Sequence, residues 1–298
     1  MMDFLVVGGT GTLGTEFIRQ NYGLANITVI SRDELKQKQL KSRFPKIRTV
    51  LCDIRDKSAV DTLFLKNDFD HVYHFAAIKH VDVCEDQPLE ALKTNVQGSR
   101  NLVEAALQST YTDRFIFSST DKAVLPINIY GMTKFIAERD LRSMVADQRK
   151  LKLMIFRWGN IMGSRGSVIP KFIETLQREK RVYITDPRMT RFWLKIEDAV
   201  SFLNQKVAAH HEIDTVRGFI GEFQPEIKAA PVLDVASAIA SILGIKDWRY
   251  ETVGIGQGEK LHEFMTPFVS SLTCPRYSFD QLVIELEPFV RSIVGINP

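Results

Sequence analysis

The sequence has few cysteines, little net charge and no long hydrophobic run. Its three cysteines, Cys52, Cys84 and Cys274, are far apart and in no metal-ligand spacing, so we expect free thiols in a reducing compartment and no metal site. A net charge of +3 gives no electrostatic reason to expect nucleic acid or a membrane surface as a partner. No stretch reaches the roughly 18 apolar residues that a membrane span needs, and the start, MMDFLVVGG, has no basic leader. We therefore expect a cytoplasmic protein.

The first half of the chain offers instead a regular alternation of short apolar segments and longer amphipathic ones. Buried parallel strands that are linked by covering helices produce this alternation. With 45% hydrophobic residues, the chain also has enough apolar side chains for a sizeable core. We predict an α/β fold with a Rossmann-type, doubly wound parallel sheet. Its predicted strands are 4–8, 27–31, 48–54, 70–76, 114–118 and 151–158.

The alternation loosens after residue 158, where loops rich in Gly, Pro and Arg separate a few helical segments. We expect residues 1–158 to form mainly a nucleotide-binding Rossmann domain. Residues 159–298 are then expected to form a smaller substrate-binding lobe over the carboxyl ends of the strands, with some segments returning to the Rossmann sheet. The chain contains no internal repeat and no low-complexity tract.

A glycine-rich turn, GGTGTLG at residues 8–14, directly follows the first predicted strand and opens a helix. Glycine is needed where backbone approaches a pyrophosphate, and the amino terminus of a helix offers N–H groups and partial positive charge. A tight turn without a ligand is the alternative, but the strand–turn–helix setting favours a dinucleotide site. The expected contacts are Gly8, Thr10, Gly11, Thr12, Leu13 and Gly14.

The segments that follow the next strands favour NADP over NAD. The second strand ends in Ser31 and Arg32 rather than in a lone acid, and this pair can bind a 2′-phosphate. Alternatively, Arg32 is a solvated loop charge. An acid after the third strand can accept a hydrogen bond from the adenine amine, and small residues after the fourth leave room for the cofactor or simply pack. These further candidates are Asp53, Ile54, Ala76 and Ala77.

The segment SSTDKAVLPINIYGMTK, residues 118–134, carries the reactive set of a short-chain dehydrogenase: Thr120, Tyr130 and Lys134. A phenol, with a pKa near about 10, is a poor base at neutral pH unless neighbouring charges favour its anion. Lys134 and a positive nicotinamide ring supply such charges, so Tyr130 can remove an alcohol proton as hydride leaves, while Thr120 donates to the same oxygen. In the alternative, Tyr130 packs in a helix and Lys134 is solvated.

Asp121 and Lys122 add an acid and a base that alcohol oxidation does not need. Once an alcohol has become a ketone, the proton on the adjacent carbon is acidic. Lys122 as base and Asp121 as acid can remove that proton and protonate a leaving hydroxyl one carbon further, so that water is lost. The alternative for these two residues is a solvated loop pair.

Taken together, these motifs resemble the UDP-N-acetylglucosamine 4,6-dehydratases of the inverting type, extended short-chain dehydrogenases of polysaccharide and nonulosonate biosynthesis. STDKA with YxxxK is specific to this resemblance, because unrelated dehydrogenases lack the Asp–Lys pair. The matching stretches, from residue 8 to about 263, are GGTGTLG, SRDELKQ, CDIRD, AAIKHVDVCE, TNVQGSRNLVEAA, STDKAVLPIN, YGMTK, RWGNIMGSRGSVIP, ITDPRMTRFW and GEKLHE.

The resemblance implies tightly bound NADP that is regenerated in each turnover, a homo-oligomer between dimer and hexamer, and a UDP-sugar substrate. It also implies the reactive set Thr120, Asp121, Lys122, Tyr130 and Lys134. Arginines can clamp the phosphates in bidentate fashion, although solvated or interface charges are the alternative for Arg188 and Arg191. The expected substrate contacts are Lys79, His80, Arg157, Asn160, Arg188, Arg191 and Glu259.

Three positions bear on how far the resemblance extends. Many relatives have Arg-Pro before GEK, where this chain has Gly256 and Gln257, so a nucleotide contact differs. Leu125 stands where asparagine is common in STDKAVNP. Some relatives carry methionine at the tyrosine position, and Tyr130 places this chain with the tyrosine-bearing members.

The resulting expectation is an enzyme that oxidises carbon 4 of UDP-N-acetylglucosamine, eliminates water across carbons 5 and 6, and returns hydride to carbon 6. Inversion at carbon 5 is favoured by the resemblance. Two alternatives are a UDP-sugar epimerase, against which Asp121 and Lys122 speak, and a non-catalytic NADP-binding sensor, against which the intact Thr120, Tyr130 and Lys134 speak.

Overall fold

The computed structural model of the chain describes residues 1–147, 151–164, 166–210 and 219–295. The chain divides into two compact units. The first comprises Met1–Arg157 and Val200–Gln224, and the second comprises Trp158–Ala199 and Pro225–Pro298. None of the described helices combines the length and the apolarity that a membrane crossing requires.

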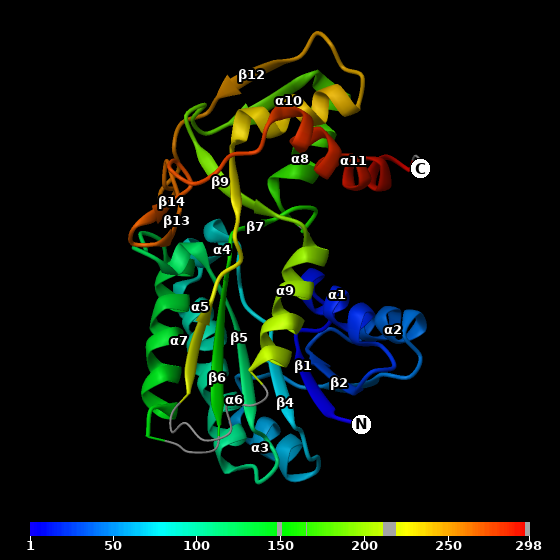
Figure 1. The fold of residues 1–298 in the computed structure, drawn as a ribbon, viewed down its shortest axis with the longest axis vertical. Coiled ribbons are helices and arrows are strands. Elements are labelled where there is room, and N and C mark those ends of the chain that lie inside the picture. The colour runs from blue at the N-terminus through cyan, green and yellow to red at the C-terminus, as the bar shows by residue number, and fades with distance from the viewer. Residues whose placement is uncertain (148–150, 165, 211–218, 296–298) are drawn as a thin grey trace. The chain divides into compact units, whose positions relative to one another are not determined.

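A seven-stranded parallel sheet forms the centre of the first unit (Figure 1), in the order β10-β6-β5-β4-β1-β2-β3. The predicted doubly wound α/β fold is confirmed. β1 pairs with β2 on one side and with β4 on the other, so the strand order reverses between β1 and β4. Ligands of such sheets bind outside the carboxyl ends of the strands at this point of reversal. The strands are β1 (Asp3–Val7), β2 (Asn26–Ser31), β3 (Arg48–Leu51), β4 (His71–His74), β5 (Arg114–Thr120), β6 (Lys152–Trp158) and β10 (Ile220–Phe223).

The seventh strand, β10, is not among the strands that the sequence predicts. It is the edge strand beside β6, with Ile220 opposite Leu153 in a parallel pair. Three of its four residues are half-buried and Glu222 is exposed. The apolar alternation of IGEF is therefore too weak and too short to mark a strand by itself.

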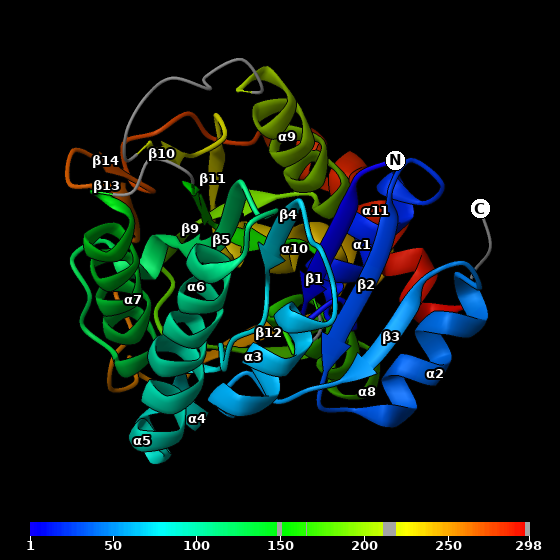
Figure 2. The ribbon, with the colours of Figure 1, turned by 90° about the horizontal axis from the view of Figure 1, so that it is seen from below.

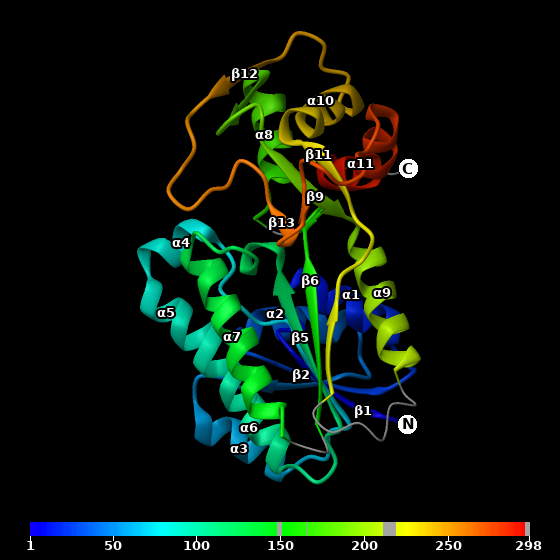
Figure 3. The same ribbon diagram turned by 60° about the vertical axis from the view of Figure 1, so that its left-hand side comes forward.

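Helices cover both faces of this sheet (Figures 2 and 3). One face carries α1 and the second part of α9, where Asn21 and Asn204 form a hydrogen bond of 3.3 Å. α3, α6 and α7 lie side by side on the other face and bury their apolar residues, such as Leu102 and Leu141, against Val72 and Phe115 of the sheet. The helices are α1 (Thr12–Asn21), α2 (Glu34–Arg43), α3 (Lys57–Leu65), α4 (Val81–Asp86), α5 (Pro88–Leu92), α6 (Gly98–Gln108), α7 (Ile129–Val145) and α9 (Ile196–Ala209).

The second unit has its own core, in which α8, α10 and α11 pack around buried residues that include Phe172, Trp193, Ile239 and Leu286. β9 lies between β11, which is antiparallel to it, and β7, which is parallel. Further short pairs are β8 with β12 and β13 with β14. The elements are β7 (Asn160–Ile161), α8 (Val168–Glu179), β8 (Arg181–Ile184), β9 (Thr190–Leu194), β11 (Lys228–Pro231), α10 (Val232–Ile242), β12 (Arg249–Thr252), β13 (Phe264–Thr266), β14 (Val269–Ser270) and α11 (Phe279–Val294).

Candidate active site

The turn between β1 and α1 packs too tightly for side chains at two of its glycines. Gly8 has a φ of +79°, and a Cβ there would lie 2.8 Å from the backbone nitrogen of Ala76. A Cβ at Gly14 would lie 2.6 Å from the carbonyl oxygen of Gly8. Gly11 is the N-cap of α1 and has no side chain with which to cap this terminus. The turn thus joins a close-packed backbone to a helix amino terminus without a cap from its own N-cap residue, an arrangement suited to a pyrophosphate. The other predicted residues of the turn, Thr10, Thr12 and Leu13, are half-buried beside it.

A cluster of charges lies beyond the ends of β2 and β3. Ser31 ends β2, and the guanidinium of Arg32, whose side chain is 52% exposed, lies 3.9 Å from the carboxylate of Asp53. Arg55 binds the same carboxylate at 2.6 Å, and this hydrogen bond above all lowers the pKa of Asp53. Asp53 is therefore an anion that can accept from an amine, while Arg32 remains accessible to a phosphate. Ile54, the next residue along the chain, is buried.

Ala76 and Ala77 follow β4 in the segment that passes the glycine turn. The segment is held by the side chain of Asn95, whose Oδ1 accepts from the backbone nitrogen of Ile78 at 2.8 Å and whose Nδ2 donates to the carbonyl oxygen of Ile78 at 2.9 Å. The same Nδ2 donates to Thr133 of α7 at 3.0 Å. Asn95 therefore fixes the alanine segment against α7. Lys79 and His80, the predicted sugar contacts of this segment, are exposed where α4 begins.

Asn95 lies in a π-helical turn, Lys93–Gln97, which the sequence does not reveal. The wider turn inserts a residue between α5 and α6, and such turns are frequent at functional sites. The TNVQGS motif that contains Asn95 was noted only as part of the resemblance, and no role was assigned to its asparagine.

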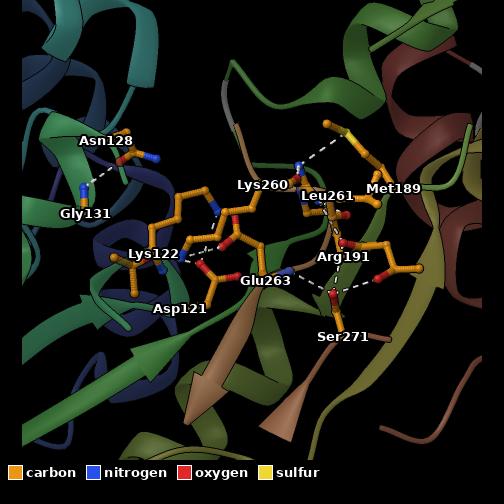
Figure 4. Close-up of polar contacts among 12 residues, drawn as sticks. Asp121, Lys122, Asn128, Gly131, Met189, Arg191, Lys260, Leu261, Glu263 and Ser271 are labelled. Carbon is orange, nitrogen blue, oxygen red and sulfur yellow. Dashed lines mark hydrogen bonds and ion pairs between the residues drawn. The ribbon is translucent and has the colours of Figure 1, made fainter. Parts of the chain in front are cut away.

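The end of β5 gathers three of the predicted reactive residues in one hydrogen-bonded cluster (Figure 4). Thr120 donates from Oγ1 to Oδ1 of Asp121 at 2.9 Å, and Lys122 donates from Nζ to the same oxygen at 3.1 Å. Asp121 is fully buried and Lys122 is partly buried. Asp121 and Lys122 are thus a coupled pair attached to Thr120, and they do not form a solvated loop pair.

Tyr130 is brought to this cluster by the start of α7. Asn128 caps the helix by accepting from the backbone nitrogen of Gly131 at 2.7 Å (Figure 4). Gly131 abuts the carbonyl oxygen of Lys122, and no Cβ could fit there. The helix therefore approaches the β5 cluster closely enough for a hydrogen bond between Tyr130 and Thr120.

The two helical reactive groups have shifted pKa values in opposite directions. Burial raises the pKa of Tyr130 to about 12, against the lowering effects of the Lys122 charge and the Thr120 hydrogen bond. Burial lowers the pKa of Lys134 to about 7, and the charge of Glu138 opposes this effect. The sequence predicts that Lys134 stabilises the phenolate of Tyr130. In the structure Lys122 exerts such an influence.

Arg157 lies within β6, inside the strand that the sequence predicts over residues 151–158. Its guanidinium binds the carboxylate of Glu138 at 2.5 Å and that of Glu222 at 3.1 Å. The arginine is therefore held by two carboxylates of the first unit.

The predicted contacts of the second unit have different surroundings. Arg188 is 72% exposed and binds Asp186 at 2.7 Å. Arg191 is buried in β9, where it donates to the carbonyl oxygens of Lys260 at 2.9 Å and Leu261 at 3.2 Å (Figure 4). The guanidinium of Arg191 is thus neither a solvated charge nor an interface charge, because it is buried and binds backbone carbonyl oxygens of its own unit. The remaining candidates, Asn160 in β7 and Glu259, which accepts from the backbone nitrogen of Gly256, are half-buried.

Comparison with known proteins supports the motif resemblance. The model of the family described as polysaccharide biosynthesis protein matches residues 4–279. A UDP-N-acetylglucosamine 4,6-dehydratase (inverting) from Campylobacter jejuni is 37% identical over 272 residues, which cover 88% of this chain and 77% of the relative. A UDP-glucose 4-epimerase from Rickettsia massiliae is 33% identical over 269 residues, which cover 87% of this chain and 76% of the relative.

Solved structures share the fold over nearly the whole chain. The X-ray structure of Pen from Bacillus thuringiensis has a TM-score of 0.85 at 26% identity and covers 97% of both chains. The dTDP-glucose 4,6-dehydratase DesIV from Streptomyces venezuelae, with NAD and TYD bound, has a TM-score of 0.78 at 21% identity and covers 99% of this chain and 98% of its own. The family match, the dehydratase relative and the shared fold together show that this chain belongs to the polysaccharide biosynthesis protein family.

Proposed function

We propose that this protein is a UDP-N-acetylglucosamine 4,6-dehydratase that inverts carbon 5. The observation that carries the proposal is the buried Asp121–Lys122 pair, hydrogen-bonded to Thr120 beside Tyr130. An oxidation needs only the hydroxyl and the phenol, whereas the pair adds the acid and the base of an elimination. The named dehydratase among the relatives supports the same reaction.

The glycine turn fits a dinucleotide, because Gly8 and Gly14 leave no space for a Cβ and the N-cap residue of α1 is Gly11, which has no side chain to cap the helix. We assign its pyrophosphate to Gly8–Gly14, its adenine to Asp53 and its 2′-phosphate to Ser31 and Arg32, which favours NADP. When bound, it supplies the hydride acceptor of the first step and the hydride donor of the last. Arg32 is the residue on which the preference for NADP depends.

In the first step Tyr130 removes the proton from the hydroxyl on carbon 4, and Thr120 holds the same oxygen. A phenol with a pKa of about 12 is almost wholly protonated at neutral pH, so Tyr130 needs cations near it to act as a base. Lys122 is one such cation, and Lys134 in its protonated form is the other. The oxidation leaves a 4-ketone that acidifies the proton on carbon 5.

In the second step the Asp121–Lys122 pair eliminates water. One proton transfer from Nζ of Lys122 to the carboxylate of Asp121, across 3.1 Å, yields a neutral amine and a carboxylic acid. The amine then takes the proton from carbon 5 while the acid protonates the leaving hydroxyl of carbon 6. Hydride returns to carbon 6 as Tyr130, protonated in the first step, gives a proton to carbon 5 on the opposite face, which inverts that carbon.

The remaining assignments concern the sugar nucleotide and the assembly. We propose that the second unit binds the substrate, with Asn160, Arg188 and Glu259 as contacts. Lys79 and His80 of the first unit are proposed as substrate contacts as well. A homo-oligomer between dimer and hexamer is also proposed. Arg157 and Arg191 are left out of the contact set, because their guanidinium groups are bound within their own units.

A second candidate is a UDP-sugar 4-epimerase, which the Rickettsia relative favours by its name. An epimerase uses the same tyrosine and lysine but returns hydride to carbon 4. It eliminates no water, so it does not need Asp121 as an acid or Lys122 as a base. Oxygen on carbon 6 is kept by an epimerase and lost by a dehydratase.

Proton NMR of the purified protein with UDP-N-acetylglucosamine in deuterated water, without added cofactor, separates these candidates. A new high-field methyl signal with deuterium at carbon 5 is expected, and the ring couplings report the configuration there. Lys122→Ala should abolish the exchange at carbon 5. A product that retains the carbon 6 hydroxyl would favour the epimerase, and no conversion of any UDP-hexose, even with added NADP⁺, would favour a non-catalytic NADP-binding sensor.

A further inference from the structure

A buried carboxylate lies beneath the reactive residues and has no part in the steps above. Glu138 of α7 is 1% exposed. Its Oε1 accepts from Oγ of Ser119 at 2.5 Å and from Nε of Arg157 at 3.0 Å, and its Oε2 accepts from the other end of the guanidinium at 2.5 Å. Glu138 is thus a fully bound anion in the core of the first unit.

These bonds join three elements that carry the site. Ser119 belongs to β5 and immediately precedes Thr120, Arg157 belongs to β6, and Glu138 lies on α7 with Tyr130 and Lys134. Arg157 also binds Glu222 of β10 at 3.1 Å. The carboxylate therefore fixes the end of β5 against the helix that bears the tyrosine and the lysine.

Glu138 also lies one helical turn after Lys134, on the same face of α7. Lys134 is 2% exposed, and its ammonium lies 3.8 Å from the ring centroid of Phe117 in β5. From β4, Lys134 faces His74, whose Nε2 bonds at 2.8 Å to Oγ of Ser99. Because that hydroxyl already donates to a backbone carbonyl, Nε2 carries a hydrogen. Burial, together with the charge of Lys134, holds the pKa of His74 well below its usual value, so the imidazole is neutral. Of the side chains just described around Lys134, which are Phe117, His74 and Glu138, Glu138 is the one that carries a negative charge.

We propose that Glu138 is a positioning residue of the active site, which holds Lys134 and Thr120 in place through its bonds to Arg157 and Ser119 and supplies the countercharge to Lys134. The charge of Glu138 raises the pKa of Lys134, against the larger lowering by burial that leaves it at about 7. Without that charge, Lys134 would lose its proton at a lower pH. Tyr130 would then lose a cation at the pH at which the enzyme works.

The direct test is the titration of Lys134 in protein with carbon-13 at the lysine ε position, assigned with Lys134→Arg and followed by NMR. In the wild type the midpoint is expected near pH 7. Glu138→Gln, which keeps the size of the side chain, should lower the midpoint by about one pH unit or more. Glu138→Asp, which keeps the charge, should largely restore it. An unchanged midpoint in Glu138→Gln overturns the proposal.

Two further variants separate the effect of the Glu138 charge on Lys134 from the structural effect of breaking the hydrogen-bond network. Glu222→Gln breaks the exposed end of the same network and should leave the midpoint of Lys134 unchanged. Glu138→Gln leaves Arg157 without its buried partner, so the double variant Glu138→Gln, Arg157→Gln serves if the single variant does not fold. The double variant should titrate between the wild type and Glu138→Gln, and a midpoint equal to that of the wild type contradicts the proposal.

The kinetic readout rests on the proposed dehydratase activity, whereas the titration does not. In Glu138→Gln, kcat should fall at alkaline pH, with its upper limb moved down by the same interval as the midpoint, and KM should change little. If the wild type does not dehydrate the sugar nucleotide, the proposed function fails while the titration still decides the role of Glu138. A lowered midpoint with an unmoved kcat profile would refute the part of Glu138 in the reaction.

Discussion

Gly131 and Lys122 touch through their backbones: the glycine faces the carbonyl oxygen of the lysine at a separation that no Cβ could occupy. The contact brings the start of α7 against the turn that follows β5. Tyr130 lies in the first turn of α7 and Thr120 ends β5. The hydrogen bond between their side chains therefore depends on this backbone contact.

Gly131→Ala should therefore damage the site from within the helix. The new methyl group has to push α7 from the Lys122 turn, and overpacking of this kind costs about 1–3 kcal/mol. Urea unfolding should show that loss, and kcat should fall by about tenfold or more because Tyr130 moves from the oxygen it serves. Met132→Ala, at the next and 40% exposed position, is the matched control and should change both quantities little.

Gly8→Ala should abolish cofactor retention. The alanine would be strained at a φ of +79° and would press on the backbone of Ala76, so the turn has to open. Gly11→Ala meets only the oxygen of Gly8, at 3.2 Å, and should retain more cofactor. The absorbance and chromatography of nucleotide released from the purified variants measure this, and equal retention by the two would count against the tight-packing explanation.

Arg32→Ala should weaken NADP binding and leave NAD binding nearly unchanged. A charged hydrogen bond to a phosphate contributes about 1.5–3 kcal/mol, which is on the order of tenfold to a hundredfold in affinity. Calorimetric titration of cofactor-free protein with both nucleotides gives the comparison. If both affinities fall equally, the exposed arginine acts through Asp53 and not through a 2′-phosphate.

Arg191→Met should loosen the segment around Lys260 and Leu261. The buried guanidinium donates to both carbonyl oxygens, and each would lose this charged hydrogen bond, although the oxygen of Leu261 keeps its bond from the backbone nitrogen of Thr190. Hydrogen exchange at residues 260–263 should quicken, and the free energy of unfolding should fall by about 1–3 kcal/mol. Arg188→Met is the control, because its 72% exposed side chain binds only a neighbouring aspartate within the described contacts. A similar loss in both variants would argue against a special part for Arg191.

Stability should rise with pH because Lys134 is buried. The unfolded chain keeps its proton up to a pKa of about 10.5, and the folded protein releases it at about 7, so between these values the unfolded state binds more protons. Between about pH 7 and 9 each pH unit adds about 1.4 kcal/mol to the free energy of unfolding of cofactor-free protein, and at higher pH the Cys84 thiol, whose pKa burial raises to about 11, opposes the rise. Lys134→Met should remove that rise, whereas Lys38→Met, at a 74% exposed side chain, should keep it.

The local patterns of the sequence predicted the sheet and the glycine turn because these depend on near neighbours. Residues whose roles depend on distant partners were missed. Asn95 works through Ile78 and Thr133, which lie 17 and 38 residues away, and its amide looks ordinary in the sequence. Glu138 reads as a helix-surface acid until Arg157, 19 residues later, is found against it. The bonds of Arg157 and Arg191 within their own units are hidden in the sequence for the same reason, because their partners Glu138 and Lys260 lie 19 and 69 residues away.

The π-helical turn at Lys93–Gln97 has a consequence for the helical phase of this part of the chain. Each residue of an α-helix advances the chain by about 100°, so the extra residue rotates everything before the turn relative to α6. Deletion of one residue there would restore a continuous helix and carry Asn95 away from Ile78 and Thr133. The π-helical turn therefore sets the spacing between Asn95 and the first turn of α6, where Gly98 packs on Ile54.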